Sequence, residues 1–201
     1  DPGERVIVTN SGIESRRLSH ADKQPEKLCV FEYIYFMRPH TIFGDRHAAT
    51  VRERIGAKLF EESHAETDIV IPVPESGVHS AVGYAEAAGL PFRWAIQKSP
   101  YVGRTFIEPT QSIRQFGVRL KLSVDQERIQ GRRVTLVDDS IVRSTTMKKL
   151  IELVRAAGAT EVHIRISSPP FAFPCFYGID TPDSKELIAA SHSVDEIRQQ
   201  I

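Results

Sequence analysis

Two adjacent carboxylates, Asp138 and Asp139, stand between a hydrophobic run and a stretch of small hydroxyl residues. The whole segment, residues 134–146, is VTLVDDSIVRSTT, which predicts a buried strand, a short loop and the start of a helix. At such a junction backbone N–H groups and the positive end of the helix dipole converge, so a phosphate can bind there. Ionised carboxylates only accept hydrogen bonds, and they therefore suit the two hydroxyls of a sugar diol. The segment predicts a pocket for a ribose 5-phosphate.

The simpler interpretation of this segment is an ordinary strand-to-helix turn in which Ser140 or Ser144 caps the helix. The complete string favours a ligand site, because hydrophobic residues, two acids and a Thr-rich loop resemble the phosphoribosyl diphosphate (PRPP) motif of type I phosphoribosyltransferases. Its exact sequence, VDDSIVR followed by Ser-Thr-Thr, resembles in particular that of the glutamine PRPP amidotransferases of that family. The resemblance implies that Asp138 and Asp139 fix the ribose. It also implies a 5-phosphate loop that consists of Ser140, Ile141, Val142, Arg143, Ser144, Thr145 and Thr146.

A second candidate loop follows another apolar run and has the sequence PVPESG at residues 72–77. Its last three residues, Glu75, Ser76 and Gly77, predict a tight turn that opens onto a helix, where N–H groups can again hold an anion. A plain capping turn is the alternative. The resemblance implies a diphosphate-binding loop, in which the Ser76 hydroxyl contacts Mg²⁺ together with Asp138 and Asp139. A site with so few ligands suits Mg²⁺, which usually keeps several waters and binds substrate phosphates.

Residues 98–122 predict a long loop, because they are rich in charge and lack apolar periodicity. A loop of this length in a compact domain is usually functional or disordered, although each cation alone also fits a solvated surface. The strings YVGRTF and VRLKL resemble the amidotransferase loop that closes over PRPP, although Ser99 and Pro100 replace the usual Asn-Arg. The resemblance implies the following catalytic residues: Lys98, Tyr101, Arg104, Lys121, Asp138 and Asp139.

The two cysteines, Cys29 and Cys175, are in the simplest interpretation buried small hydrophobic residues. Their surroundings, CVFEYIYF and PFAFPCFYGID, resemble the amidotransferases that carry a [4Fe–4S] cluster, and each cysteine then supplies one thiolate. Such a cluster needs four cysteine ligands, and this sequence contains two. We therefore expect a shortened chain that descends from a cluster-bearing parent.

The composition fits one soluble domain spanning residues 1–201. Lysine plus arginine equals aspartate plus glutamate at 26 each, which argues against nucleic acid and anionic membranes as partners. The sequence contains no apolar run of membrane-spanning length, and two distant cysteines do not make a secreted disulfide framework, so we expect a cytoplasmic protein. The first methionine is Met37, which predicts a piece of a longer protein.

The hydrophobic pattern predicts alternating strands and helices, and hence an α/β fold with a parallel sheet covered by helices on both faces. The ligand site should lie at the carboxyl ends of the strands. The resemblance adds a type I phosphoribosyltransferase fold with a smaller hood region. Strands are predicted at residues 5–9, 29–38, 68–73, 92–96, 133–137 and 162–167, and helices at residues 47–63, 77–89, 146–157 and from about residue 194.

The resemblance implies transfer of ammonia to C1 of PRPP, which gives phosphoribosylamine and diphosphate at the start of purine synthesis. It implies a glutaminase domain and a C-terminal tail outside this fragment, a homo-oligomer, and ammonia but not glutamine as the nitrogen source here. One alternative is a nucleobase salvage phosphoribosyltransferase, for which Phe171 and Phe173 are the aromatic residues after the strand at 162–167. The other is a non-catalytic PRPP-binding regulator, which would need a basic face that the neutral composition does not favour.

Overall fold

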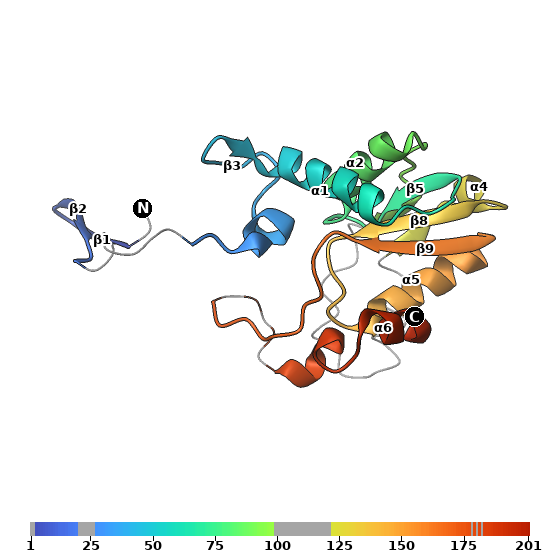
Figure 1. Ribbon diagram of the computed structural model, residues 1–201. Helices are drawn as coiled ribbons and strands as arrows, with labels where there is room; N and C mark the ends of the chain where they lie inside the picture. Colours follow the sequence, from blue (N-terminus) through green and yellow to red (C-terminus); the bar gives the residue numbers. More distant parts are fainter. Residues whose placement is uncertain (1–2, 20–26, 99–121, 178, 180, 182) are drawn as a thin grey trace.

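A three-stranded parallel sheet forms the centre of the computed structural model, which describes residues 3–19, 27–98, 122–177, 179, 181 and 183–201. Its strands stand in the order β5 (Ile69–Pro72), β8 (Arg133–Asp138) and β9 (Glu161–Ile166). Helices lie on both faces of this sheet (Figure 1). The predicted α/β class and parallel sheet are therefore confirmed.

Two helices, α1 (Ala48–Glu62) and α2 (Val78–Ala88), cover one face of the sheet (Figure 1). They approach each other so closely that a Cβ on Gly83 would lie 1.8 Å from the Glu53 carbonyl oxygen. As predicted, α2 ends at Gly89, whose φ of 64° is left-handed and free of steric cost only for glycine.

The opposite face is covered by α5 (Ser144–Ala156) and by the C-terminal α6 (Val194–Gln200) (Figure 1). Side chains alternate between the two faces of the sheet, because successive strand residues point in opposite directions. The core on the α5 side includes Ile69, Ile71, Val134, Leu136, Leu150 and Val154. The core on the α2 side includes Val70, Val137, Ala81, Tyr84 and Ala85.

An antiparallel ribbon of β6 (Ile96–Lys98) and β7 (Leu122–Val124) joins the two ends of residues 99–121, with Lys98 opposite Leu122. The short helix α4 (Gln126–Ile129) follows this ribbon. The strand predicted at residues 92–96 is displaced toward the C-terminus. Phe92 makes only an isolated parallel bridge to Val70, and regular pairing begins at Ile96.

The N-terminal part contains a ribbon of β1 (Glu4–Thr9) and β2 (Gly12–Arg17), which lies apart from the sheet and its helices (Figure 1). β1 was predicted and β2 was not, because GIESRR lacks apolar alternation. A second small ribbon pairs β3 (Ile42–Phe43) with β4 (Arg46–His47).

The strand predicted at residues 29–38 is wrong, because this segment forms a π-helix, η2 (Glu32–Phe36). Its aromatic and β-branched residues favour a strand locally, but strand preference depends on partners to pair with. Here the backbone turns instead, with the Met37 N–H donating to the Glu32 carbonyl, and Ile34 points into the interior.

The tail forms two 3₁₀ turns, η4 (Ser184–Glu186) and η5 (Ile188–Ala190), before α6 begins where the sequence predicted a helix. α6 starts with a capping box between Ser193 and Glu196, and the hydrogen bond from the Ser193 N–H lowers the pKa of the Glu196 carboxyl. Among the described residues, no helix combines the length and apolar character needed to cross a membrane.

Candidate functional site

Two loops meet at the carboxyl ends of the neighbouring strands β5 and β8. The Val73 N–H donates to the Val137 carbonyl oxygen at 2.8 Å, which extends the strand pairing into the loop after β5. A Cβ added to Gly77 would lie 2.3 Å from this same oxygen and 3.1 Å from the Asp138 Cα. Residue 77 is therefore glycine because the two loops touch through their backbones. The peptide bond between Pro74 and Glu75 in this loop is cis.

The helices that start at these loops have no side-chain cap. The N-cap of α2 is Gly77, which has no side chain, and that of α5 is Arg143, whose side chain accepts no hydrogen bond from the helix. Neither Ser140 nor Ser144 caps α5, so the simpler interpretation of this segment as a capped turn does not hold. The first N–H groups of a helix need acceptors, and both helices present theirs at the same sheet edge.

Helices elsewhere in the described structure satisfy their first N–H groups from within the chain. The side chains of Asp125 and Ser193 cap α4 and α6. In α1 the N–H groups of Ala48 and Ala49 donate to backbone carbonyls of the preceding turn. In α2 the Val78 N–H likewise donates to the Glu75 carbonyl at 3.4 Å, so the contrast singles out the start of α5 as suited to an anionic ligand.

The carboxylates of Asp138 and Asp139 lie in the second of these loops, where Asp138 is half-buried and Asp139 is buried. One Asp138 oxygen accepts from the Asp139 N–H at 2.8 Å, and the Asp139 Oδ1 accepts from the Ser140 N–H at 2.7 Å. Burial, followed by the adjacent negative charge of Asp139, raises the pKa of Asp138 well above its ordinary range. The second Asp139 oxygen, Oδ2, is buried without a hydrogen-bond partner. A buried acceptor left in this state indicates a missing donor or cation.

The residues of this edge fit Mg²⁺ in the sparse manner that its chemistry favours. Among the described residues, no group of three or more acidic, histidine or cysteine side chains could enclose a metal ion. The two carboxylates and the half-buried Ser76 are the oxygen donors on offer. Mg²⁺ commonly binds through one or two carboxylates, water and substrate phosphates, so this set suits a metal that arrives with a diphosphate.

The loop between Asp139 and α5 is fixed by the tail of the chain. The Val142 carbonyl accepts from the Ile188 N–H at 3.1 Å, and Arg143 forms an ion pair with Glu186. Ile141 packs against the core on the α5 side of the sheet. The predicted phosphate loop is therefore held together, but the Arg143 side chain is directed to the tail and not left free for phosphate.

The remaining predicted residues are placed as follows. Glu75 is exposed on the turn before α2, and Lys98 is exposed at the end of β6. Ser144 is half-buried at the start of α5, and Thr145 and Thr146 after it are exposed. Tyr101, Arg104 and Lys121 lie outside the described residues.

The segments around the two cysteines come close together. The ring of Phe31 packs against that of Phe171, with the ring centroids 5.2 Å apart. Cys29 is exposed, and the sulfur of Cys175 accepts from the N–H groups of Tyr177 at 3.4 Å and Ile179 at 3.5 Å. Hydrogen bonds of this kind stabilise negative charge on a thiolate ligand.

Sequence analysis missed Arg52, a buried arginine of α1. Its guanidinium donates to the carbonyl oxygens of Tyr33 at 2.6 Å and Met37 at 2.7 Å. Burial lowers the pKa of Arg52, and the negative charge of Asp139 opposes this effect. Its position in the sequence could have indicated this burial. Arg52 precedes the buried Gly56 by about one helical turn, so both residues lie on the face of α1 that points into the protein.

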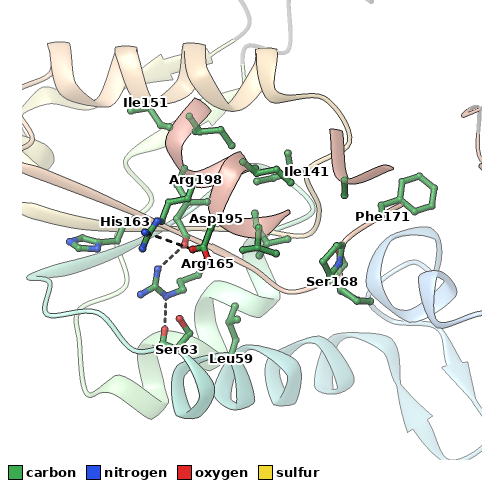
Figure 2. A pocket seen from close by; sticks show the side chains of 18 of the residues that line it. Leu59, Ser63, Ile141, Ile151, His163, Arg165, Ser168, Phe171, Asp195 and Arg198 are labelled. Carbon is green, nitrogen blue, oxygen red and sulfur yellow. Dashed lines mark hydrogen bonds and ion pairs between the residues drawn. The ribbon is translucent and has the colours of Figure 1, made fainter. Parts of the chain in front are cut away.

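A cavity of about 660 Å³ lies elsewhere, at the outer edge of β9 and between α1, α5 and α6 (Figure 2). Arg165 crosses this cavity to donate to the Ser63 carbonyl, and Arg198 lies 3.7 Å from Asp195 (Figure 2). Of the predicted site residues, Ile141 alone lines it. The acid pair and the uncapped helices therefore locate the candidate site better than this hollow does.

Comparisons with known proteins agree with the arrangement of these loops. A family model described as phosphoribosyl transferase domain matches residues 46–167, which include both loops. The chain is 49% identical over 201 residues to the amidophosphoribosyltransferase of Bacillus subtilis and 52% identical over 200 residues to that of Synechococcus elongatus. It is covered completely in both cases but spans only 42% and 40% of those two proteins.

Solved structures extend this likeness to the fold. Glutamine phosphoribosylpyrophosphate amidotransferase from B. subtilis, complexed with ADP and GMP, superposes with a TM-score of 0.84 at 49% identity, covering 99% of this chain and 43% of that one. A structure described as the allosteric regulatory enzyme of purine biosynthesis gives a TM-score of 0.83 with 42% of its chain covered. The predicted type I phosphoribosyltransferase fold and the resemblance to amidophosphoribosyltransferases are thus confirmed. The chain belongs to the phosphoribosyl transferase domain family.

Proposed function

We propose that the chain carries out the phosphoribosyl transfer step of an amidophosphoribosyltransferase. Ammonia attacks C1 of PRPP, a C1–N bond forms as the C1–O bond to diphosphate breaks, and the bonding electrons leave with diphosphate. The nitrogen then loses one proton to give 5-phosphoribosylamine. The observation that carries this proposal is the meeting, at one sheet edge, of two helix starts without side-chain caps and an acid pair of which Asp139 is buried and Asp138 half-buried.

Each loop has a distinct task in this proposal. The N–H groups at the start of α5 and the hydroxyls of Ser144, Thr145 and Thr146 bind the 5-phosphate, which is remote from the bond that breaks. The turn of Glu75, Ser76 and Gly77, at the start of α2, binds the diphosphate. Because Gly77 touches the backbone of Asp138, the two anion sites have a fixed separation, and this orients C1 between them.

The acid pair is suited to the ribose that lies between these sites. Burial and the neighbouring charge raise the pKa of Asp138, so a ligand that gives hydrogen bonds or positive charge to the pair stabilises it. Ribose hydroxyls donate such bonds, and Mg²⁺ held by the diphosphate supplies the charge. When bound, Mg²⁺ would be held by Asp138, Asp139 and Ser76 and would neutralise negative charge on the leaving diphosphate.

Four predictions from the resemblance remain part of this proposal. Residues 98–122 close over PRPP with Lys98, Tyr101, Arg104 and Lys121, of which only Lys98 lies in the described part. Cys29 and Cys175 supply two ligands of a [4Fe–4S] cluster, which the two cysteines of this sequence do not complete alone. The protein is cytoplasmic. It forms a homo-oligomer.

A glutaminase domain is the proposed source of ammonia. The ribbon of β1 and β2 supports a partner surface of this kind, because Val8 and Ile13 are 73% and 74% exposed on the face where they pair. A contiguous apolar patch on an isolated ribbon is typical of an interface. In the absence of such a domain we expect ammonia, and not glutamine, to support turnover.

Calorimetry with PRPP and Mg²⁺ tests the binding part of this proposal. We expect the chain to bind, and Asp138→Asn with Asp139→Asn to abolish measurable binding. The matched control is Glu61→Gln with Glu62→Gln, which removes two adjacent exposed acids from α1 and should bind like the unchanged chain. Equal affinity of the two double variants for PRPP would contradict the assignment of Asp138 and Asp139 to PRPP binding.

Turnover separates the proposal from its rivals. Diphosphate release from PRPP should depend on ammonia and Mg²⁺. Release that depends on a nucleobase instead would indicate a salvage enzyme, and binding without release under either condition would indicate a regulator. Phe171 argues against a base-stacking role, because its ring already packs on Phe31.

A further inference from the structure

The tail segment that contains η4 and η5 contacts the loop to which the 5-phosphate is assigned. The Ile188 N–H donates to the Val142 carbonyl oxygen at 3.1 Å, and the Glu186 carboxylate forms an ion pair with the Arg143 guanidinium. Both loop residues stand directly before α5, whose N-cap is Arg143. One main-chain bond and one side-chain contact thus join the start of α5 to a segment more than forty positions away in sequence.

This part of the tail is itself held in place. Leu187, which lies between the two contacting residues, is 1% exposed and so anchors the segment in the interior. The Asp183 carboxylate caps η4 by accepting from the Lys185 N–H at 2.9 Å. A contact restrains a loop only if its partner is fixed, and here the partner is fixed by burial and by its own hydrogen bonds.

The ion pair also decides what Arg143 can do. Its guanidinium is directed to Glu186, so the 5-phosphate is left to the N–H groups and hydroxyls at the start of α5. The two side chains are 52% and 45% exposed, and an ion pair this exposed adds little to the stability of the fold. Its effect is local: it keeps the residues before α5 in one arrangement, which lowers the cost of ordering them when a ligand binds.

We propose that Glu186 and the Ile188 N–H are positioning groups, which hold Val142 and Arg143 so that the first N–H groups of α5 face the 5-phosphate. Arg143 then connects the loop to the tail and does not itself bind phosphate. The tail lies outside residues 46–167, the stretch that the family model matches. The proposal rests on the proposed function, since it assigns this loop to the 5-phosphate.

The ion pair is tested by calorimetry with ribose 5-phosphate. Glu186→Gln and Arg143→Gln should each weaken binding by about twofold to fivefold, the modest effect expected of an exposed pair. The double variant should lose no more than either single variant, because each change breaks the same contact. The matched control is Asp195→Asn, which breaks the exposed pair with Arg198 in α6 and should bind like the unchanged chain.

The signs of the two single effects distinguish positioning from direct binding. If Arg143 were a phosphate ligand that Glu186 withholds, Glu186→Gln would release the guanidinium and tighten binding, whereas Arg143→Gln would weaken it. Effects of opposite sign would therefore overturn the proposal. Unchanged affinity in Glu186→Gln would overturn it as well.

The main-chain contact is tested by Ile188→Pro, which removes the N–H that Val142 accepts. Leu187 before it has φ −94° and ψ 113°, an extended conformation that suits a residue followed by proline. The affinity for ribose 5-phosphate should fall by about fivefold to tenfold, because the Val142 carbonyl loses its donor. The control Val194→Pro places proline at the first position of α6, where it is well tolerated, and should change nothing.

Diphosphate binding with Mg²⁺ separates positioning from general damage to the structure. The turn of Glu75, Ser76 and Gly77 makes no hydrogen bond or ion pair to the tail in the described part of the chain. Diphosphate affinity should therefore be the same in every variant, and an equal loss for both ligands would overturn the proposal. Failure of the unchanged chain to bind ribose 5-phosphate would refute the proposed function and the role of the tail with it. Binding that is insensitive to Glu186 would refute that role alone.

Discussion

The parallel sheet and the N-terminal ribbon place their apolar residues in opposite ways. In β5 and β8, Ile71 and Leu136 are completely covered, whereas Val8 and Ile13 in the ribbon are among the most exposed large apolar residues of the described chain. The sheet has helices on both faces, while the ribbon has two strands and lies apart (Figure 1). The difference teaches that the geometry of the candidate site depends on the sheet and its helices, and not on the ribbon.

The largest effect should come from breaking the packing that supports the sheet. Gly83→Ala would place a Cβ 1.8 Å from the Glu53 carbonyl oxygen, and because backbone cannot move aside easily, α1 and α2 must separate. We expect the free energy of unfolding to fall by about 3 kcal/mol, as overpacking of a tight contact does. Urea unfolding measures this. The control Ala87→Leu adds more atoms on the exposed side of α2 and should change little; an equal loss there would contradict the steric explanation.

A change where the two loops touch should destabilise the chain less than Gly83→Ala does, but it should reduce activity more. Gly77→Ala would place a Cβ 2.3 Å from the Val137 carbonyl oxygen and push the turn after β5 away from Asp138. Because this contact fixes the distance between the two anion sites, kcat/KM for PRPP should fall by about a hundredfold. The free energy of unfolding should fall by about 1–2 kcal/mol. If a folded Gly83→Ala variant lost as much activity as Gly77→Ala, the idea that Gly83 supports packing while Gly77 shapes the candidate site would be wrong.

The sheet and both loops could be predicted from the sequence, because each depends on local patterns that the tertiary structure reinforces. Apolar runs that end in PVPES and VDDS specify buried strands, and parallel pairing then brings their ends to one edge. The absence of side-chain caps on α2 and α5 could not be predicted, since Ser140 and Ser144 are both good capping residues.

The segment before α1 was mispredicted because its structure depends on a contact distant in sequence. Aromatic and β-branched residues at 29–38 favour a strand, but in the folded chain Arg52 binds carbonyls of the η2 turn, and none of the described strands pairs with this segment. Arg52 escaped notice for the same reason, since a charged residue in an amphipathic helix is ordinarily exposed. Long-range hydrogen bonds between side chain and backbone leave no periodic signal.

A smaller effect is expected from a buried polar pair on the sheet. The hydroxyls of Thr67 and Thr135 lie 2.7 Å apart and both residues are buried. Thr135→Val leaves the Thr67 hydroxyl without a partner, so the free energy of unfolding should fall by about 1–2 kcal/mol. Replacing both residues by valine should recover part of the loss in urea unfolding. A double variant less stable than Thr135→Val would show that the pair is not the cause.

The beginning of the sheet also has a pH-dependent contact. Hydrogen bonds from Arg133 lower the pKa of the Asp68 carboxyl below its ordinary value, and Asp68 also accepts from the Arg133 N–H at 2.8 Å. An acid whose pKa is lower in the folded chain stabilises it above the unfolded pKa of about 4, and this contribution is lost as the pH falls through the folded value. Asp68→Asn should therefore reduce the difference in stability between pH 7 and pH 3. If Asp68→Asn left the difference in stability between pH 7 and pH 3 unchanged, the contact between Asp68 and Arg133 would not be the cause of that pH dependence.

The smallest effect should come from the ribbon. Val8→Ser with Ile13→Ser removes two exposed side chains that pair with each other across β1 and β2 and that pack on no described core. The free energy of unfolding should change by less than about 0.5 kcal/mol, as is usual for exposed positions, and PRPP affinity should stay the same. In the presence of a glutaminase domain the same variant should weaken transfer from glutamine while sparing transfer from ammonia. A large loss of stability in the chain alone would mean that the ribbon packs on the sheet, and the contrast between the two regions would be lost.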